Sequence, residues 1–176
     1  TAYLHDLVTT DRRDPTVNAY GKIYGALENS ADYLPVLDPT AHSTEQITVF
    51  PEDPTYVREA QTAMATSPYW GDEEIWDSAT TVHNPMMDSD GRVWITSRAR
   101  DPGNVPTFCQ EGSDHPSAQA FPLGRSGRHL GVYDPRTDTY TPINTCFGTH
   151  HLMFAEDADN TLWTSGGGTA VGWFNT

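Results

Sequence analysis

The chain has 176 residues, of which 36% are hydrophobic, 11% aromatic and 19% charged, and it contains 14 glycines and 13 prolines. This composition has too many aromatic residues for a disordered chain and too much glycine and proline for a helical bundle. Ten basic residues against 24 acidic ones give a net charge of −14. We therefore expect no nucleic-acid partner and no attraction to an anionic membrane surface. No apolar run approaches the ~18 residues of a membrane span, and the N-terminal residues lack the pattern of a signal peptide.

Three segments share one pattern, in which a histidine opens a short apolar strand, a turn follows, and an aromatic residue lies in the next strand. In chain order, the segments and their aromatic residues are 5–26 with Tyr24, 83–96 with Trp94 and 151–165 with Trp163. The loop is longer in the first segment than in the other two. The pattern predicts one hairpin of two short strands in each segment.

A second pair of matching segments predicts two further strands in each repeat. Residues 33–39 and 129–135 both alternate into an Asp-Pro turn, and each is followed by a second β-rich run, at 45–50 and 139–144. Asp-Pro starts turns because proline fixes φ and the aspartate side chain can bond the backbone beyond it. The repeat is therefore four short antiparallel strands, which is typical of a β-propeller blade.

The repeat predicts an all-β fold, a partial β-propeller over residues 1–176. In chain order we expect a first blade at about 1–50, a helical insertion at 51–78, a second blade at about 79–145 with a lid insertion at 98–128, and an incomplete third blade at about 146–176. Known propellers close with roughly four to eight blades. We therefore expect a fragment of a larger closed propeller, partnered by the remainder of that propeller. The alternative is a self-contained open sheet, which would expose unpaired strand edges.

The motif His-Asn-Pro-Met-Met-Asp-Ser-Asp-Gly-Arg-Val-Trp-Ile-Thr at 83–96, with the turn Asp-Pro-Arg-Thr at 134–137, resembles the blades of streptogramin-lyase-like and NHL-type β-propellers. The resemblance covers the repeat skeleton at 1–50, 79–98 and 128–176. It implies a propeller fold and a lyase-type elimination on a small organic substrate.

One histidine opens the first strand of each repeat, and in a propeller this strand lines the central channel. His5, His83 and His151 are therefore candidate ligands of a transition metal (Fe, Cu or Zn), because an all-histidine shell favours these ions. His83 and His151 are also candidates for general acid–base catalysis. The alternative is that these imidazoles cap the strands and bond backbone carbonyls or water. Strict alternation along a strand predicts that His150 points to the face opposite His151, so we count it with packing and substrate-binding candidates rather than with the metal ligands.

Both insertions are expected on the face where the histidine strands begin, around the mouth of the channel. Glu28, Arg98 and Arg100 follow strands at that face and are candidates for substrate binding. The alternative is that each is a solvated loop residue or part of an ion pair.

The two cysteines are expected on this same face. Cys109 lies in the lid insertion and Cys146 lies shortly before His150. We predict a disulfide that fastens the lid to the channel rim, and with it an extracytoplasmic location, periplasmic or secreted. Two buried free thiols or a soft metal site are the alternatives.

These observations predict an extracytoplasmic enzyme that acts on a small organic molecule at a histidine-lined axial site, by metal-assisted or acid–base chemistry, lyase-like or oxidative. A non-catalytic propeller that binds a protein, peptide or glycan on its loop-rich face is the alternative. A purely structural repeat, with a channel filled by apolar side chains, is the third possibility.

Overall fold

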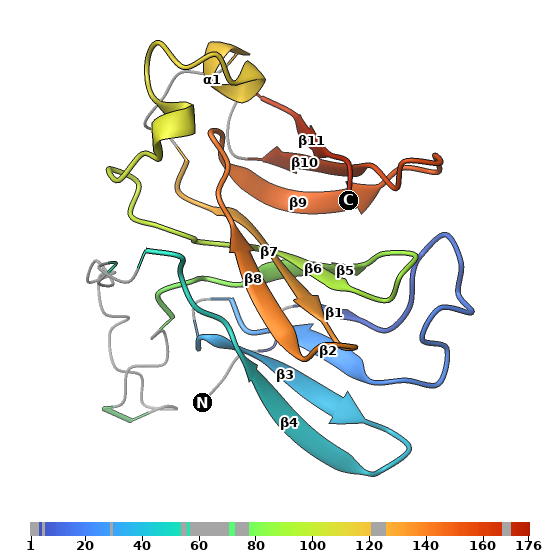
Figure 1. Cartoon of the computed structure of the whole chain (residues 1–176). Coiled ribbons are helices and arrows are strands. Elements are labelled where there is room, and N and C mark those ends of the chain that lie inside the picture. Colours follow the sequence, from blue (N-terminus) through green and yellow to red (C-terminus); the bar gives the residue numbers. More distant parts are fainter. Residues whose placement is uncertain are drawn as a thin grey trace.

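The structure, a computed structural model, describes residues 4, 6–28, 30–53, 56, 71–72, 78–120, 126–166 and 170–176. These residues form eleven β-strands in three antiparallel sheets, with very little helix (Figure 1). The predicted all-β class is confirmed. Most of the predicted helical insertion at 51–78 lies outside the described residues.

Each sheet is a meander in which strands that follow one another in sequence pair side by side. The first sheet contains β1 (Asp6–Val8), β2 (Ile23–Ala26), β3 (Tyr33–Asp38) and β4 (Ser43–Thr48). The second contains β5 (His83–Met87), β6 (Val93–Ser97), β7 (His129–Asp134) and β8 (Thr139–Ile143). The third contains β9 (Thr149–Phe154), β10 (Leu162–Gly166) and β11 (Gly172–Phe174). The strands predicted from the repeat are therefore present in the predicted order.

The Asp-Pro segments form the hairpin turns that the sequence predicts. The Asp38 carboxylate accepts the backbone N–H groups of Thr40 and Ala41 at 2.9 and 2.8 Å. The Asp134 carboxylate accepts the N–H of Arg136 at 2.9 Å in the same way. Each aspartate thus satisfies turn donors that a hairpin leaves without a strand partner.

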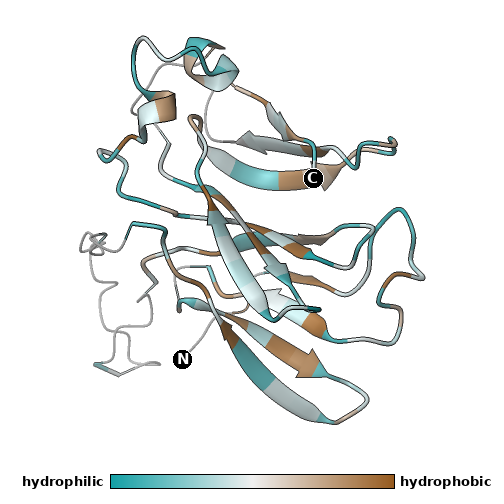
Figure 2. Ribbon diagram, viewed as in Figure 1, coloured by the Kyte–Doolittle hydropathy of each residue, from teal (hydrophilic) through white to brown (hydrophobic). Residues whose placement is uncertain are grey.

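The three sheets pack face to face, with the second sheet between the other two and the first strands β1, β5 and β9 side by side (Figure 1). One face of the second sheet, including Val93 and Tyr133, packs against the first sheet. Its other face, including Trp94 and Leu130, packs against the third sheet. Figure 2 shows hydrophobic segments on strands such as β3, whereas β4 and much of the connecting loops are hydrophilic. Burial of apolar side chains between the sheets is the main source of stability.

One row of residues recurs across all three sheets. In each sheet, three residues on adjacent strands are cross-strand partners and form this row. In sheet order the rows are Val8–Tyr24–Val36, Met86–Trp94–Val132 and Met153–Trp163–Trp173. The aromatic residue in the centre of each row is the one that marks the repeat in the sequence. The first two rows pack against the next sheet in the chain.

The lid insertion contains a 3-10 helix at Thr107–Cys109 and the short helix α1 at Pro116–Ala120. Cys109 and Cys146 form a disulfide with an S–S distance of 2.09 Å, as predicted. The bond joins the lid to the segment that leads into β9. Among the described residues, no helix has the length and apolar character that crossing a lipid bilayer requires.

Candidate metal centre

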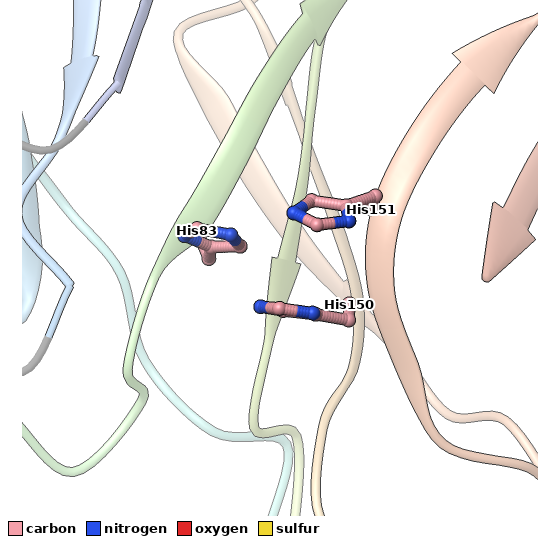
Figure 3. Close-up of side chains that lie close together, drawn as sticks. All are labelled: His83, His150 and His151. Atoms are coloured by element: carbon pink, nitrogen blue, oxygen red, sulfur yellow. The ribbon is translucent and has the colours of Figure 1, made fainter. Parts of the chain in front are cut away.

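Three histidines from two sheets lie together near the starts of β5 and β9. His83 opens β5, and His150 and His151 follow the first residue of β9 (Figure 3). One ligand nitrogen of each imidazole lies within 4.8 Å of the other two. The ring centroids are 4.6 Å apart for His83 and His150, 5.3 Å for His83 and His151, and 4.1 Å for His150 and His151. His83 and His151 were predicted to converge, and they do.

The expectation that His150 points away from His151 is wrong, and a β-bulge is the reason. In the β9–β10 register His151 pairs with Ser165 but Thr149 pairs with Gly166, so His150 is an extra residue on β9. An extra residue interrupts the strict alternation of side chains and changes where they point. Two consecutive imidazoles consequently reach the same side of the strand.

A second irregularity lies on β5, next to His83. His83 pairs with Thr96 and Met86 with Trp94, so three steps along β5 oppose two along β6. Asn84, within this irregularity, has a φ of 48°, a left-handed conformation that asparagine adopts more readily than most residues. Its side-chain oxygen accepts the backbone N–H of Leu152 at 2.6 Å and so links β5 to β9.

Thr96 of β6 connects the backbones of the two histidine strands. Its fully buried hydroxyl lies 3.2 Å from the carbonyl oxygen of His83 and 3.0 Å from that of His150. The shared donor and the Asn84 link hold the second and third sheets together at the site. The backbones that carry the imidazoles are therefore held in place by the side-chain hydrogen bonds of Thr96 and Asn84.

The three imidazoles differ in how far they are buried. His83 is buried, His150 is intermediate and His151 is exposed. Burial lowers the pKa of His83 to about 4, against the opposing effect of the Glu28 carboxylate. His83 is therefore neutral at pH 7, which is the form that binds a metal.

Two carboxylates of the first sheet lie beside His83. Its Nδ1 atom is 3.7 Å from Asp6 Oδ2 and 3.7 Å from Glu28 Oε2. The other oxygen of Glu28 accepts a hydrogen bond from Arg128 Nη2 at 2.8 Å. All three sheets consequently supply side chains to this site, and Glu28, predicted for the rim, is one of them.

Arg98 and Arg100, also predicted for the rim, bond to loop segments. Arg98 Nη1 donates to the hydroxyl of Tyr56 at 3.1 Å. Arg100 is only 3% exposed and donates to the Ser126 hydroxyl and to the carbonyl of Thr145. Arg100 thus ties the lid insertion to the segment before Cys146. These hydrogen bonds do not involve the three histidines.

The remaining predicted ligand, His5, lies outside the described residues. Sequence reasoning did not find Asp6 or Arg128. Each is adjacent in sequence to a histidine, His5 and His129, but a single acidic or basic residue at a strand end carries no pattern of its own. Only the packing of the first sheet against the second brings Asp6 to His83 and Glu28 to Arg128.

Three imidazole nitrogens with one exposed side form a ligand set that suits Zn, Cu or Fe. Three protein ligands are also the usual number in catalytic zinc sites, which keep a fourth position for water or substrate. The site therefore belongs to the class of candidate histidine metal centres on an all-β frame. No protein-family model matches the chain, and no curated protein matches it significantly.

Proposed function

We propose that this chain is part of an extracytoplasmic β-propeller enzyme that acts on a small organic substrate at a transition-metal centre held by His83, His150 and His151. The observation that carries the proposal is the convergence of three imidazoles from two sheets within 4.8 Å. His150 joins the predicted ligands His83 and His151 in this set, whereas the predicted ligand His5 lies outside the described residues.

The recurring row of residues supports a propeller with more sheets than these three. In the second sheet, Trp94 of this row is 4% exposed because the third sheet covers it. The same row of the third sheet is uncovered, with exposed fractions of 53% for Met153, 43% for Trp163 and 62% for Trp173. An apolar row that is buried in one repeat and exposed in the next indicates a missing neighbour. A further sheet of the same propeller is the neighbour that this repeat fits.

The opposite end of the stack supports the same proposal. On the outer face of the first sheet, Leu7 is 56% exposed and Leu37 is 43% exposed. Leu37 corresponds in the repeat to Tyr133, which is 5% exposed in the second sheet. Both ends of the stack therefore present faces that the middle sheet buries. The disulfide supports the proposed location, since such bonds persist in oxidising compartments.

A bound transition metal would supply Lewis acidity or redox chemistry at the open side of the cluster. The chain's own groups serve binding and proton transfer. His83 is held neutral and acts as a ligand rather than as an acid at pH 7. The carboxylates of Asp6 and Glu28 are the groups beside the cluster that can accept a proton. A lyase-like elimination needs such a base, whereas an oxidation needs the metal.

Metal analysis of the purified protein tests the proposal. We expect stoichiometric Zn, Cu or Fe after exhaustive dialysis, and its loss in the His83→Ala and His151→Ala variants. His42→Asn is the matched control, because His42 is an exposed turn residue of the first sheet with a φ of 54° that asparagine tolerates. Failure of the wild-type protein to bind any of the three metals would refute the proposed centre.

A non-catalytic propeller that binds a protein, peptide or glycan is the second candidate function. The long lid favours it, because the lid is fixed by a disulfide and presents Phe108 with 38% of its surface exposed. This candidate predicts that His83→Ala leaves partner binding unchanged while Phe108→Ala weakens it. The enzyme proposal predicts that His83→Ala reduces substrate turnover, whereas Phe108→Ala leaves it unchanged.

A further inference from the structure

We infer that Glu28 and Asp6 are positioning residues of the metal centre, whose carboxylates lie beside the Nδ1 atom of His83 and leave its Nε2 atom to bind the ion. This inference rests on the proposed function. It adds an acidic outer layer, supplied by the first sheet, to a histidine cluster that the second and third sheets supply. Figure 3 shows the ring of His83 extending from β5 toward His150 and His151.

The position of the carboxylates selects the tautomer of His83. A neutral imidazole has one N–H donor and one acceptor nitrogen. Asp6 Oδ2 and Glu28 Oε2 both lie 3.7 Å from Nδ1, and two negative oxygens favour a proton on the nitrogen that faces them. The lone pair of the ring is then on Nε2. At 3.7 Å these contacts are electrostatic rather than hydrogen bonds. A carboxylate beside the second ring nitrogen of a histidine ligand is the common arrangement in metalloproteins.

Arg128 gives Glu28 a fixed orientation. Arg128 bonds Oε1 at 2.8 Å while Oε2 faces His83, so the two oxygens of one carboxylate have separate partners. Both side chains are largely buried, with exposed fractions of 17% for Arg128 and 21% for Glu28. A buried pair with this geometry has little freedom to reorient, because separating it leaves an uncompensated charge.

The charges also favour a cation at the cluster. Among the described residues, Asp6 and Glu28 contribute two negative charges beside His83 and Arg128 contributes one positive charge. The carboxylates also increase the basicity of the imidazole to which they are linked. Loss of an outer carboxylate typically reduces metal affinity by about 10- to 100-fold.

The experiment compares Zn²⁺ affinity and the Co²⁺ absorption spectrum in the full chain. The variants are Glu28→Gln and Asp6→Asn, which keep size and remove charge. Glu45→Gln is the matched control, because Glu45 also forms an ion pair, with Lys22, but lies on β4 at the opposite edge of the first sheet. We expect Zn²⁺ dissociation constants about 10- to 100-fold higher for Glu28→Gln, higher for Asp6→Asn as well, and unchanged for Glu45→Gln. Partial rescue is expected for Glu28→Asp.

The Co²⁺ spectrum separates a positioning role from direct ligation. We expect the visible bands of bound Co²⁺ to keep their positions in Glu28→Gln while the affinity falls. Displaced bands would mean that Glu28 is itself a ligand, and unchanged affinity in both variants would mean that neither carboxylate acts on the site; either result overturns the inference and leaves the histidine centre intact. Should Glu28→Gln fail to fold, Asp6→Asn decides alone, because Asp6 is 34% exposed at the sheet edge. Absence of Zn²⁺ and Co²⁺ binding in the wild-type protein would instead refute the proposed function.

Discussion

The stability of this protein should depend on the neutral state of one fully buried imidazole, that of His129 at the start of β7. The side chain is 0% exposed, and its Nδ1 atom accepts the backbone N–H of Ala99 at 3.0 Å. Burial lowers the pKa of His129 to about 3, and the nearby charge of Arg100 acts in the same direction. Protonation would therefore both charge a buried ring and remove the acceptor of Ala99.

The sign and size of the effect follow from the two pKa values. In the unfolded chain His129 titrates near its ordinary value of 6.5. Between pH 6.5 and about 3 the unfolded chain consequently binds one more proton at this residue than the folded chain does. The free energy of unfolding falls with decreasing pH across this window, by about 1.4 kcal/mol per pH unit and by about 5 kcal/mol in total. The contribution is complete above pH 6.5 and does not change further below about pH 3.

Denaturant unfolding of the metal-free protein between pH 7.5 and 4.5 measures this effect. The comparison variant is His129→Asn, whose Oδ1 atom can still accept the Ala99 N–H but cannot be protonated. Other titrating groups are common to both proteins, so they cancel in the difference. We expect the wild-type advantage to decrease by about 3 kcal/mol between pH 7.5 and 4.5. Parallel pH profiles would refute the argument that the buried ring stays neutral.

Three further changes test other parts of the structure. Replacing Cys109 and Cys146 together by serine should lower the free energy of unfolding by about 4 kcal/mol in the chain-entropy model for a separation of 37 residues, measured by guanidinium denaturation under oxidising conditions; an unchanged midpoint would contradict it. Trp94→Phe removes the hydrogen bond from the indole N–H to the buried Asp88 carboxylate at 2.8 Å and should cost about 1–3 kcal/mol in the same assay, whereas no loss would show that the bond is replaced. Thr96→Val should cost a similar amount and weaken Zn²⁺ binding, because it removes the donor shared by both histidine strands; Thr96→Ser is the control that should retain binding.

The repeat made most of the fold predictable. A strand that alternates into an Asp-Pro turn has few other local solutions, since Asp38 and Asp134 satisfy their turns through their own side chains. The disulfide was predictable for a related reason: the β6–β7 connection and the connection from β8 to β9 of the next sheet were expected on one face, which brings Cys109 and Cys146 within reach. In both cases the determining contacts are local, or they follow from the order of the strands.

The site was less predictable because it depends on departures from regular strand geometry. Alternation predicts opposite directions for His150 and His151, and nothing in the sequence marks the extra residue on β9 that brings them to one side. Asp6 reaches His83, and Glu28 reaches Arg128, only through the packing of one sheet against another. Sequence periodicity predicts which way the side chains of a single strand point, but it does not predict which residues of neighbouring sheets come into contact.

The places where the strands depart from regularity favour a functional site over a structural one. Thr81 and Asn84, on either side of His83, both have left-handed φ angles, of 46° and 48°, and an extra residue interrupts β9 at His150. A left-handed β-branched residue costs about 1–3 kcal/mol, and histidines that only capped two strands would need none of these features. Elsewhere in the described chain, the non-glycine residues with left-handed φ lie in turns and are of types that tolerate it, at Asn18, His42, Asp138 and Asn160. Two left-handed residues beside His83 and an extra residue at His150 therefore place the irregular strand geometry at the candidate metal centre, which supports the proposal that the positions of these imidazoles matter for function.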